Sequence, residues 1–177
     1  YPLPAVMIST TDNNGKMNIM TASWAGTICS DPAMVSISVR KERYSYHMIR
    51  ETGEFVINLT TEKLVKAADY CGVRSGRDVD KWKEMNLTPM KADVVNAPLI
   101  AESPVNIECR VKEIHELGTH DMFIADVVAV HCDNSLMDEK NVFHLNDAGL
   151  IVYSHGTYFS LGESVGTFGF SVQKKKT

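Results

Sequence analysis

Two β-rich runs in the second half of the chain constrain its fold more than any other feature. Residues 122–132 form a long run dominated by β-branched and other apolar side chains, and apolar side chains alternate along residues 105–111. The linking residues 116–121 have the length and composition of a hairpin loop. The sequence therefore predicts two long antiparallel strands joined by a hairpin.

Shorter segments add further strands and helices. Residues 5–10 end at a turn marked by Asn14-Gly15, residues 34–39 alternate apolar side chains with Ser36 and Ser38, and residues 54–58 and 150–153 have strand composition. Residues 44–52 and 62–71 have helical patterns, which Gly53 and Gly72 are expected to end. Six or seven strands with two or three short helices predict a mainly β, closed antiparallel barrel.

Composition narrows the class of protein. With 177 residues, 44% of them hydrophobic, residues 1–177 are expected to form a single domain with its own core. The formal charge of −4 argues against a nucleic-acid partner, and the basic run at 174–176 is interpreted as a solvated tail. There is neither an apolar run of about 18 residues nor a signal-peptide pattern, so we expect a cytoplasmic protein without a membrane partner.

The cysteines and histidines do not predict a metal centre. Cys29, Cys71, Cys109 and Cys132 are scattered and form no Cys-x-x-Cys pair, so reduced thiols are expected. Cys71 lies close in sequence to the ligand motifs described below and is interpreted as structural, with a redox role as the alternative. The histidines lack the spacing of metal ligands, and we therefore predict no metal.

Several common catalytic motifs are absent from the sequence. It contains no Gly-x-Gly-x-x-Gly, no Gly-x-Ser-x-Gly and no His-Glu-x-x-His. This excludes the Rossmann, hydrolase and metalloprotease interpretations. It does not exclude the use of a nicotinamide nucleotide.

Residues 18–24 form the first of three motifs that indicate a ligand. They combine the amide of Asn18, the hydroxyls of Thr21 and Ser23, a small Ala22 and the indole of Trp24. Small side chains let the backbone approach a flat ligand while the indole packs beside it. The alternative is an ordinary strand with the two hydroxyls on its solvent face.

The second motif, residues 40–45, places cations before the start of a helix. Arg40, Lys41 and Arg43 precede the first turn, which contains Ser45. Cations and the free N–H groups of a helix start bind phosphate together. The alternative is a solvated basic connector.

The third motif, residues 75–82, contains Ser75, Gly76 and Lys81. The alternative interpretation is a loop and a helix start, with Asp78 or Asp80 as the helix cap. Taken together, the three motifs hold the donors needed for a ligand that is flat at one end and phosphorylated at the other. Flavin mononucleotide (FMN) has this form.

These motifs, in this order, resemble the flavin reductase-like (flavoredoxin) family of FMN-binding split barrels. The resemblance extends to residues 5–10, to Cys71-Gly72 and to residues 158–163. It implies a Greek-key split barrel that forms a homodimer and builds its flavin site near the subunit interface. The cofactor-binding residues expected from the motifs and the resemblance are Asn18, Met20, Thr21, Ala22, Ser23, Trp24, Ser38, Val39, Arg40, Lys41, Ser45, Ser75, Gly76, Lys81, His155 and Tyr158.

The resemblance implies an FMN-binding oxidoreductase that transfers electrons or hydride from NAD(P)H, or from a reduced protein donor, to an acceptor through the flavin. Two variants remain open: a flavin reductase that releases reduced flavin, and a carrier that retains its FMN and serves redox protein partners. No catalytic side chain is assigned, because the flavin would carry the chemistry. A non-catalytic split-barrel module for ligand binding or interaction is the alternative.

Overall fold

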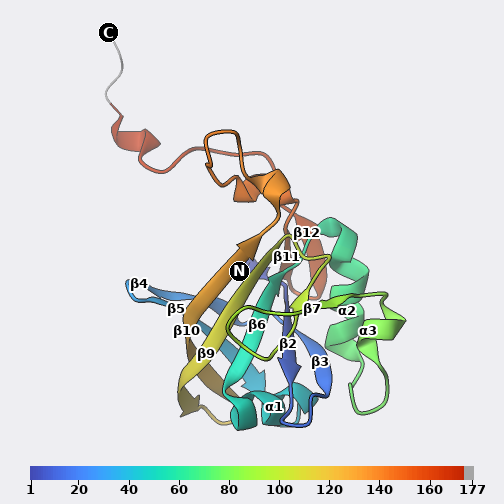
Figure 1. The fold of residues 1–177 in the computed structure, drawn as a ribbon. Helices are drawn as coiled ribbons and strands as arrows, with labels where there is room; N and C mark the ends of the chain where they lie inside the picture. The colour runs from blue at the N-terminus through green and yellow to red at the C-terminus, as the bar shows by residue number, and fades with distance from the viewer. Residues whose placement is uncertain (174–177) are drawn as a thin grey trace.

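The two long strands predicted from the sequence lie at the centre of a seven-stranded antiparallel sheet (Figure 1). The computed structural model describes residues 1–173. The hairpin loop is shorter than predicted, because the paired strands extend to Glu116 and resume at His120. In spatial order the strands are β3 (Met17–Ala22), β2 (Val6–Thr11), β6 (Glu54–Leu59), β9 (Val105–Glu116), β10 (His120–Cys132), β5 (Ala33–Arg40) and β4 (Ala25–Ser30).

The sheet curls into a barrel around an apolar core. Phe55, Phe123 and Ile37 are fully buried there, and the rings of Tyr46 and Phe123 pack in a T-shaped arrangement. On β5, buried Val35, Ile37 and Val39 alternate with the half-buried Ser36 and Ser38, as the sequence predicts. Residues 23 and 24 connect the two edge strands, β3 and β4, and the Trp24 carbonyl accepts a hydrogen bond from the Ser38 amide, which continues the pairing of β4 with β5. The predicted mainly β barrel is confirmed.

The first predicted helix is confirmed and the second differs at its end. Gly53, with φ of 69°, caps α1 (Tyr44–Thr52). The prediction that Gly72 ends the next helix is wrong, because α2 (Val65–Val73) runs through it. A Cβ at Gly72 would lie 3.3 Å from Cβ of Thr21, so this glycine allows α2 to lie close against β3. The third helix is α3 (Lys81–Glu84), which Asp80 caps with its side chain.

α2 and α3 cover the outer face of β2 and β3 (Figure 1). Met7 and Ile19 pack there against Ala68, Cys71 and Trp82, in a second apolar core outside the barrel. This layer holds residues 74–80, which connect α2 to α3, beside the edge strand β3. The third sequence motif is thereby brought to the first.

The remaining elements are short. The sequence did not predict β4, whose small and mostly exposed residues show no alternation. None of the helices in residues 1–173 is long and apolar enough to cross a membrane. The basic run at 174–176 lies outside the described residues. The short elements are β1 (Leu3–Pro4), β7 (Pro89–Met90), β8 (Leu99–Ile100), β11 (Ile151–Ser154), β12 (Thr157–Ser160), η1 (Glu62–Leu64), η2 (Asn134–Leu136), η3 (Leu145–Ala148) and η4 (Phe170–Val172).

Candidate functional site

Three adjoining cavities follow β3 and the residues beside it. We call them the strand-end cavity, of about 150 Å³, the cationic cavity, of about 260 Å³, and the outer cavity, of about 860 Å³. The strand-end cavity is lined by residues 20–24, 38–40, 43 and 120, the cationic cavity by 18, 20, 40, 42–45, 73–77 and 81, and the outer cavity by 16–18, 76–83 and 86–89.

The strand-end cavity lies against an edge strand. Within residues 1–173, β3 pairs only with β2, so the backbone groups on its other side have no strand partner there. The Thr21 hydroxyl donates a hydrogen bond to the Ala68 carbonyl of α2 and fixes the strand against this helix. A flat ligand with polar edges can therefore bond to backbone groups here.

Trp24 and His120 form an aromatic wall of the strand-end cavity. Their ring centroids are 4.4 Å apart, and Trp24 is 51% exposed. Burial, together with the charge of Arg40, lowers the pKa of His120. His120 therefore takes up a proton less readily than a free imidazole, and it lines the cavity beside the indole.

Close approach of Gly76 to Asn18 shapes the cationic cavity. A Cβ on Gly76 would lie 2.0 Å from Oδ1 of Asn18 and 3.0 Å from the ring of Tyr44. Asn18 Nδ2 in turn donates to Oγ of Ser45, in the first turn of α1, at 2.8 Å. The first, second and third sequence motifs thus meet at one point.

Cations surround this point. Arg40, Arg43, Arg74 and Arg77 all line the cationic cavity. Arg43 donates to the carbonyl of Gly72, while Arg77 donates to that of Glu42. With α1 beginning at Tyr44, the cavity combines guanidinium groups with a helix N-terminus, the arrangement that binds phosphate.

Lys81 lies between the cationic and outer cavities and is 3% exposed. Its Nζ donates to the carbonyls of Ile19 (2.6 Å) and Cys71 (2.8 Å), which leaves one of its three protons for another acceptor. Burial lowers the pKa of Lys81 to about 8. Burial also raises the pKa of Cys71 to about 11, which supports the interpretation of this thiol as structural.

Most of the predicted site residues come together at these cavities, and three do not. Lys41 turns away from all three cavities, because its Nζ lies 3.2 Å from Oδ1 of the buried Asp121. His155 stacks on Tyr1, the Tyr158 hydroxyl donates to Asp69 of α2, and neither residue lines any of these three cavities. The residues brought together are Asn18, Met20, Thr21, Ala22, Ser23, Trp24, Ser38, Val39, Arg40, Ser45, Ser75, Gly76 and Lys81.

The polar side chains that line the cavities but are missing from the predicted site residues include Arg74, Arg77 and His120. Arg74 follows the end of α2, and the cluster of two arginines at Arg74 and Arg77 around Ser75-Gly76 was a usable signal. His120 is distant in sequence from every motif. It reaches the cavity only because β10 pairs with β5, with His120 opposite Arg40.

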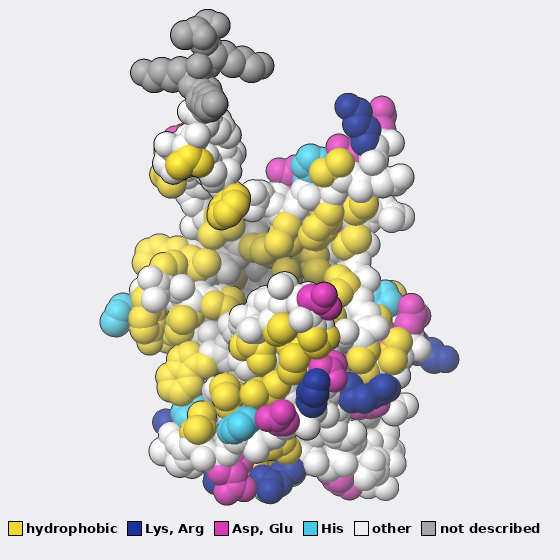
Figure 2. Space-filling model, turned by 90° about the vertical axis from the view of Figure 1, so that its left-hand side faces the viewer, with side chains coloured by type: hydrophobic (Ala, Val, Ile, Leu, Met, Phe, Trp, Pro, Cys, Tyr) yellow, Lys and Arg dark blue, Asp and Glu magenta, His cyan; other side chains and the backbone are white. Residues whose placement is uncertain are grey.

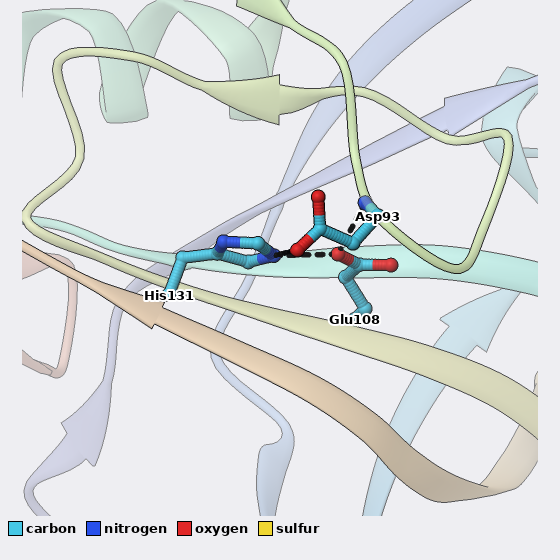
Figure 3. Close-up of side chains that lie close together, drawn as sticks. All are labelled: Asp93, Glu108 and His131. Carbon is cyan, nitrogen blue, oxygen red and sulfur yellow. Dashed lines mark hydrogen bonds and ion pairs between the residues drawn. The ribbon is translucent and has the colours of Figure 1, made fainter.

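Carboxylates and a histidine also gather at Asp93, Glu108 and His131 (Figure 3), away from these cavities. Their candidate ligand atoms lie within 4.8 Å of one another. The buried Glu108 carboxylate already accepts the backbone N–H groups of Asp93, Val94 and Val95, and His131 Nε2 lies 2.6 Å from it. Burial opposes ionisation, but these hydrogen bonds outweigh it and lower the pKa of Glu108. These hydrogen bonds hold the loop at residues 93–95 against β9.

Comparisons of the sequence and of the structure with known proteins identify the same family. The chain matches the model of the flavin reductase like domain over residues 1–162. Its structure is similar to flavoredoxin of Desulfovibrio vulgaris (Miyazaki F), with a TM-score of 0.91 and 31% identity, and to a flavoredoxin from Methanosarcina acetivorans, with a TM-score of 0.87 and 27% identity. Each similarity covers 98% of this chain and 94% of the other. An uncharacterized protein of Archaeoglobus fulgidus is 31% identical over 140 residues, which are 79% of this chain and 78% of that protein.

Proposed function

This chain belongs to the flavin reductase-like domain family, and we propose that it is an FMN-binding oxidoreductase. In this proposal it passes hydride or electrons to an acceptor from NAD(P)H or from a reduced protein donor. The observation that carries the proposal is the junction of the cationic cavity with an edge strand at Asn18, Gly76 and Ser45. FMN needs these two features side by side, because its phosphate binds cations and its flat polar ring binds free backbone groups.

The residues fit FMN at both ends. The cationic cavity offers guanidinium groups, the Ser45 and Ser75 hydroxyls and the start of α1 for the phosphate. The strand-end cavity offers the outer backbone edge of β3 and the Trp24–His120 wall for the ring. Gly76 keeps the junction open, since a side chain there would displace Asn18.

The side chains at this site bind and orient the flavin. Bound FMN supplies the electron and hydride chemistry. Arg40 and Arg43 line both the cationic and the strand-end cavity, where they balance negative charge, and Trp24 limits the access of water to the ring end. Burial lowers the pKa of two cavity residues, His120 and Lys81, and neither is needed as a catalytic acid for a flavin reaction.

We propose a homodimer as the working form. Figure 2 shows hydrophobic side chains gathered across one face of the molecule. Large apolar side chains that are exposed in the single chain include Ile28, Val130, Phe143 and Phe159. A face rich in exposed apolar side chains is typical of protein interfaces. The four unpaired thiols fit a reducing compartment, which supports the cytoplasm as the proposed location.

The test of the proposed function is an anaerobic titration of the FMN-loaded protein with NADPH and then NADH, followed by the visible absorption of the flavin. Rapid bleaching by either nucleotide indicates a nicotinamide-dependent reductase. Colour that only dithionite removes indicates a carrier fed by a redox protein. Failure of the protein to load FMN would contradict the proposal and favour a non-catalytic module.

A further inference from the structure

Asp93, Glu108 and His131 form a group of metal-ligating side chains away from the three cavities, which we call the loop triad. Figure 3 shows these side chains pointing toward one another from a loop, from β9 and from β10. One ligand atom from each residue lies within 4.8 Å of the other two. A single ion bound between them can therefore contact all three after small movements of the side chains.

The carboxylate of Glu108 is fully buried and has no permanent cation beside it. Among residues 1–173, its ion-pair partner is the imidazole of His131, and no lysine or arginine nitrogen lies within 4.0 Å of it. An imidazole carries positive charge only when it is protonated. Buried charges in proteins are paired with an opposite charge or coordinate a metal ion. A divalent ion bound here would supply a permanent positive charge.

Hydrogen bonds hold Glu108 in place and leave one contact that an ion can replace. Its Oε2 accepts the amides of Val94 and Val95, and its Oε1 accepts the amide of Asp93. The other contact of Oε1 is a hydrogen bond with Nε2 of His131, at 2.6 Å. An ion that takes the place of this proton forms one bond to oxygen and one to nitrogen. The displaced proton moves to Nδ1 of a neutral imidazole, or to water from an imidazolium.

The movements that an ion requires are small. Ligand atoms bound to a tetrahedral zinc ion lie about 3.3 Å apart, so Nε2 of His131 must withdraw from Oε1 of Glu108 by about 0.7 Å. Oδ2 of Asp93, now 4.0 Å from Nε2, must approach it. The Asp93 side chain is 77% exposed and that of His131 is 26% exposed, so both can move. Their exposed side also gives an ion a path to the buried carboxylate.

The donor atoms of the loop triad favour zinc. An imidazole nitrogen and two carboxylate oxygens are ligands that zinc accepts, and three protein ligands leave a fourth position for water. Calcium and magnesium prefer sites built entirely of oxygen atoms. The three ligands are separated by 15 and 23 residues in the sequence. The histidine spacing that predicts no metal therefore carries no signal of this site.

We propose that the loop triad binds one zinc ion, which ties the loop between β7 and β8 to β9 and β10. This loop carries three residues of a third apolar core, Ala92, Val95 and Ala97. Because the three ligands come together only in the folded chain, zinc stabilises the fold by mass action. The proposal is independent of the proposed function, because the loop triad lies outside the three cavities.

The test adds zinc chloride to the full chain, prepared without a histidine tag and freed of metal with a chelator. Competition with a chromophoric chelator gives the Kd and the stoichiometry, and thermal denaturation with and without zinc gives the change in Tm. His131→Gln and Asp93→Asn each remove one ligand and leave the three amide hydrogen bonds to Glu108 in place.

Two further variants are matched controls for binding elsewhere on the surface. His144→Gln removes a histidine that pairs with one carboxylate, that of Asp138, at 3.1 Å. Cys132→Ser removes the exposed thiol next to His131 in the sequence. Neither control changes a ligand of the loop triad.

We expect the wild type and both controls to bind one zinc ion per chain with a Kd below about 10 μM, and to show a Tm that rises with zinc concentration. His131→Gln should weaken zinc binding by about 100-fold or more and Asp93→Asn by about tenfold. The rise in Tm should be lost in His131→Gln.

A wild-type Kd above about 10 μM would overturn the proposal. So would zinc binding that His131→Gln and Asp93→Asn leave unchanged. Loss of zinc binding in His144→Gln or Cys132→Ser, as large as that in His131→Gln, would assign the ion to those surface groups and overturn it as well. FMN affinity, measured separately by flavin fluorescence, should be the same with and without zinc, so failure of this proposal leaves the proposed function standing.

Discussion

A Cβ on Gly76 would lie only 2.0 Å from Oδ1 of Asn18, so no side chain fits between the loop after α2 and the edge strand while Asn18 keeps its place. Gly76→Ala should therefore displace Asn18 from Ser45 and lower FMN affinity about tenfold, as measured by flavin fluorescence titration. Gly162→Ala is the control, because a Cβ there would meet no atom of residues 1–173 within 4 Å. Wild-type FMN affinity in the Gly76→Ala variant would exclude this contact from the site.

Substitution of the two neighbouring cations Arg40 and Lys41, at the end of β5, should affect FMN binding differently. Arg40 lines both the cationic and the strand-end cavity, whereas Lys41 pairs with the buried Asp121. Arg40→Ala should weaken FMN binding about tenfold and leave binding of riboflavin, which has no phosphate, unchanged. Lys41→Ala should preserve the affinity for both ligands and lower the free energy of unfolding, because Asp121 loses an ionic partner. Equal losses of FMN affinity in the two variants would contradict the assignment.

The charge of Lys81 should make FMN binding depend on pH. Burial lowers the pKa of Lys81 in the flavin-free protein to about 8, so the ammonium that attracts phosphate is present below this pH and is lost above it. FMN affinity should therefore fall between about pH 8 and pH 9.5, by up to about tenfold per pH unit. Riboflavin affinity, measured by the same fluorescence titration, should not follow. Parallel pH profiles for the two ligands would show that Lys81 does not act on the phosphate.

Trp24 should affect the flavin more than the fold. The indole is 51% exposed and is held mainly against His120. Trp24→Ala should shift the absorption of bound flavin and reduce quenching of its fluorescence, with a change in unfolding free energy within about 0.5 kcal/mol. The measurements are flavin spectroscopy and urea denaturation. A destabilised variant with an unaltered flavin spectrum would identify Trp24 as a packing residue only.

Glu108 should stabilise the folded protein at neutral pH and lose this effect in acid. Its folded-state pKa is lower than in the unfolded chain, so its contribution is present above the ordinary carboxyl pKa and is lost as pH falls through the lowered value. Glu108→Gln should lower the free energy of unfolding at pH 7 by about 2 kcal/mol and flatten its acid dependence. Asp93→Asn is the control, since only the backbone amide of Asp93 bonds to Glu108. Urea denaturation from pH 7 to pH 3 measures both effects.

Locally encoded features of the fold could be predicted from the sequence. Gly53 ends α1 as expected because capping depends on a few neighbouring residues and on a left-handed backbone conformation. The same reasoning is wrong at Gly72, where the absence of a side chain serves the packing of α2 on Thr21, not helix termination. That requirement comes from tertiary structure and has no local signal.

The candidate site likewise has features that the local sequence predicts and features that depend on tertiary structure. Arg40 and Lys41 are neighbours in sequence, and their motif could not show that one faces the cationic cavity while the other pairs with Asp121. His120 enters the site through strand pairing with Arg40. The contributions expected from the resemblance at His155 and Tyr158 are not made within the single chain. The motifs therefore predicted segments that line the candidate cavities, and strand pairing and helix packing decided which side chains face them.

Titration of the flavin-free protein with FMN and with riboflavin tests the central claim most directly. The claim is that one flavin binds with its phosphate in the cationic cavity, beside Asn18 and Gly76. The expected result is one FMN bound per chain, with a Kd at least about tenfold lower than that for riboflavin. No change in flavin fluorescence with either ligand, or equal affinity for the two, would contradict the account.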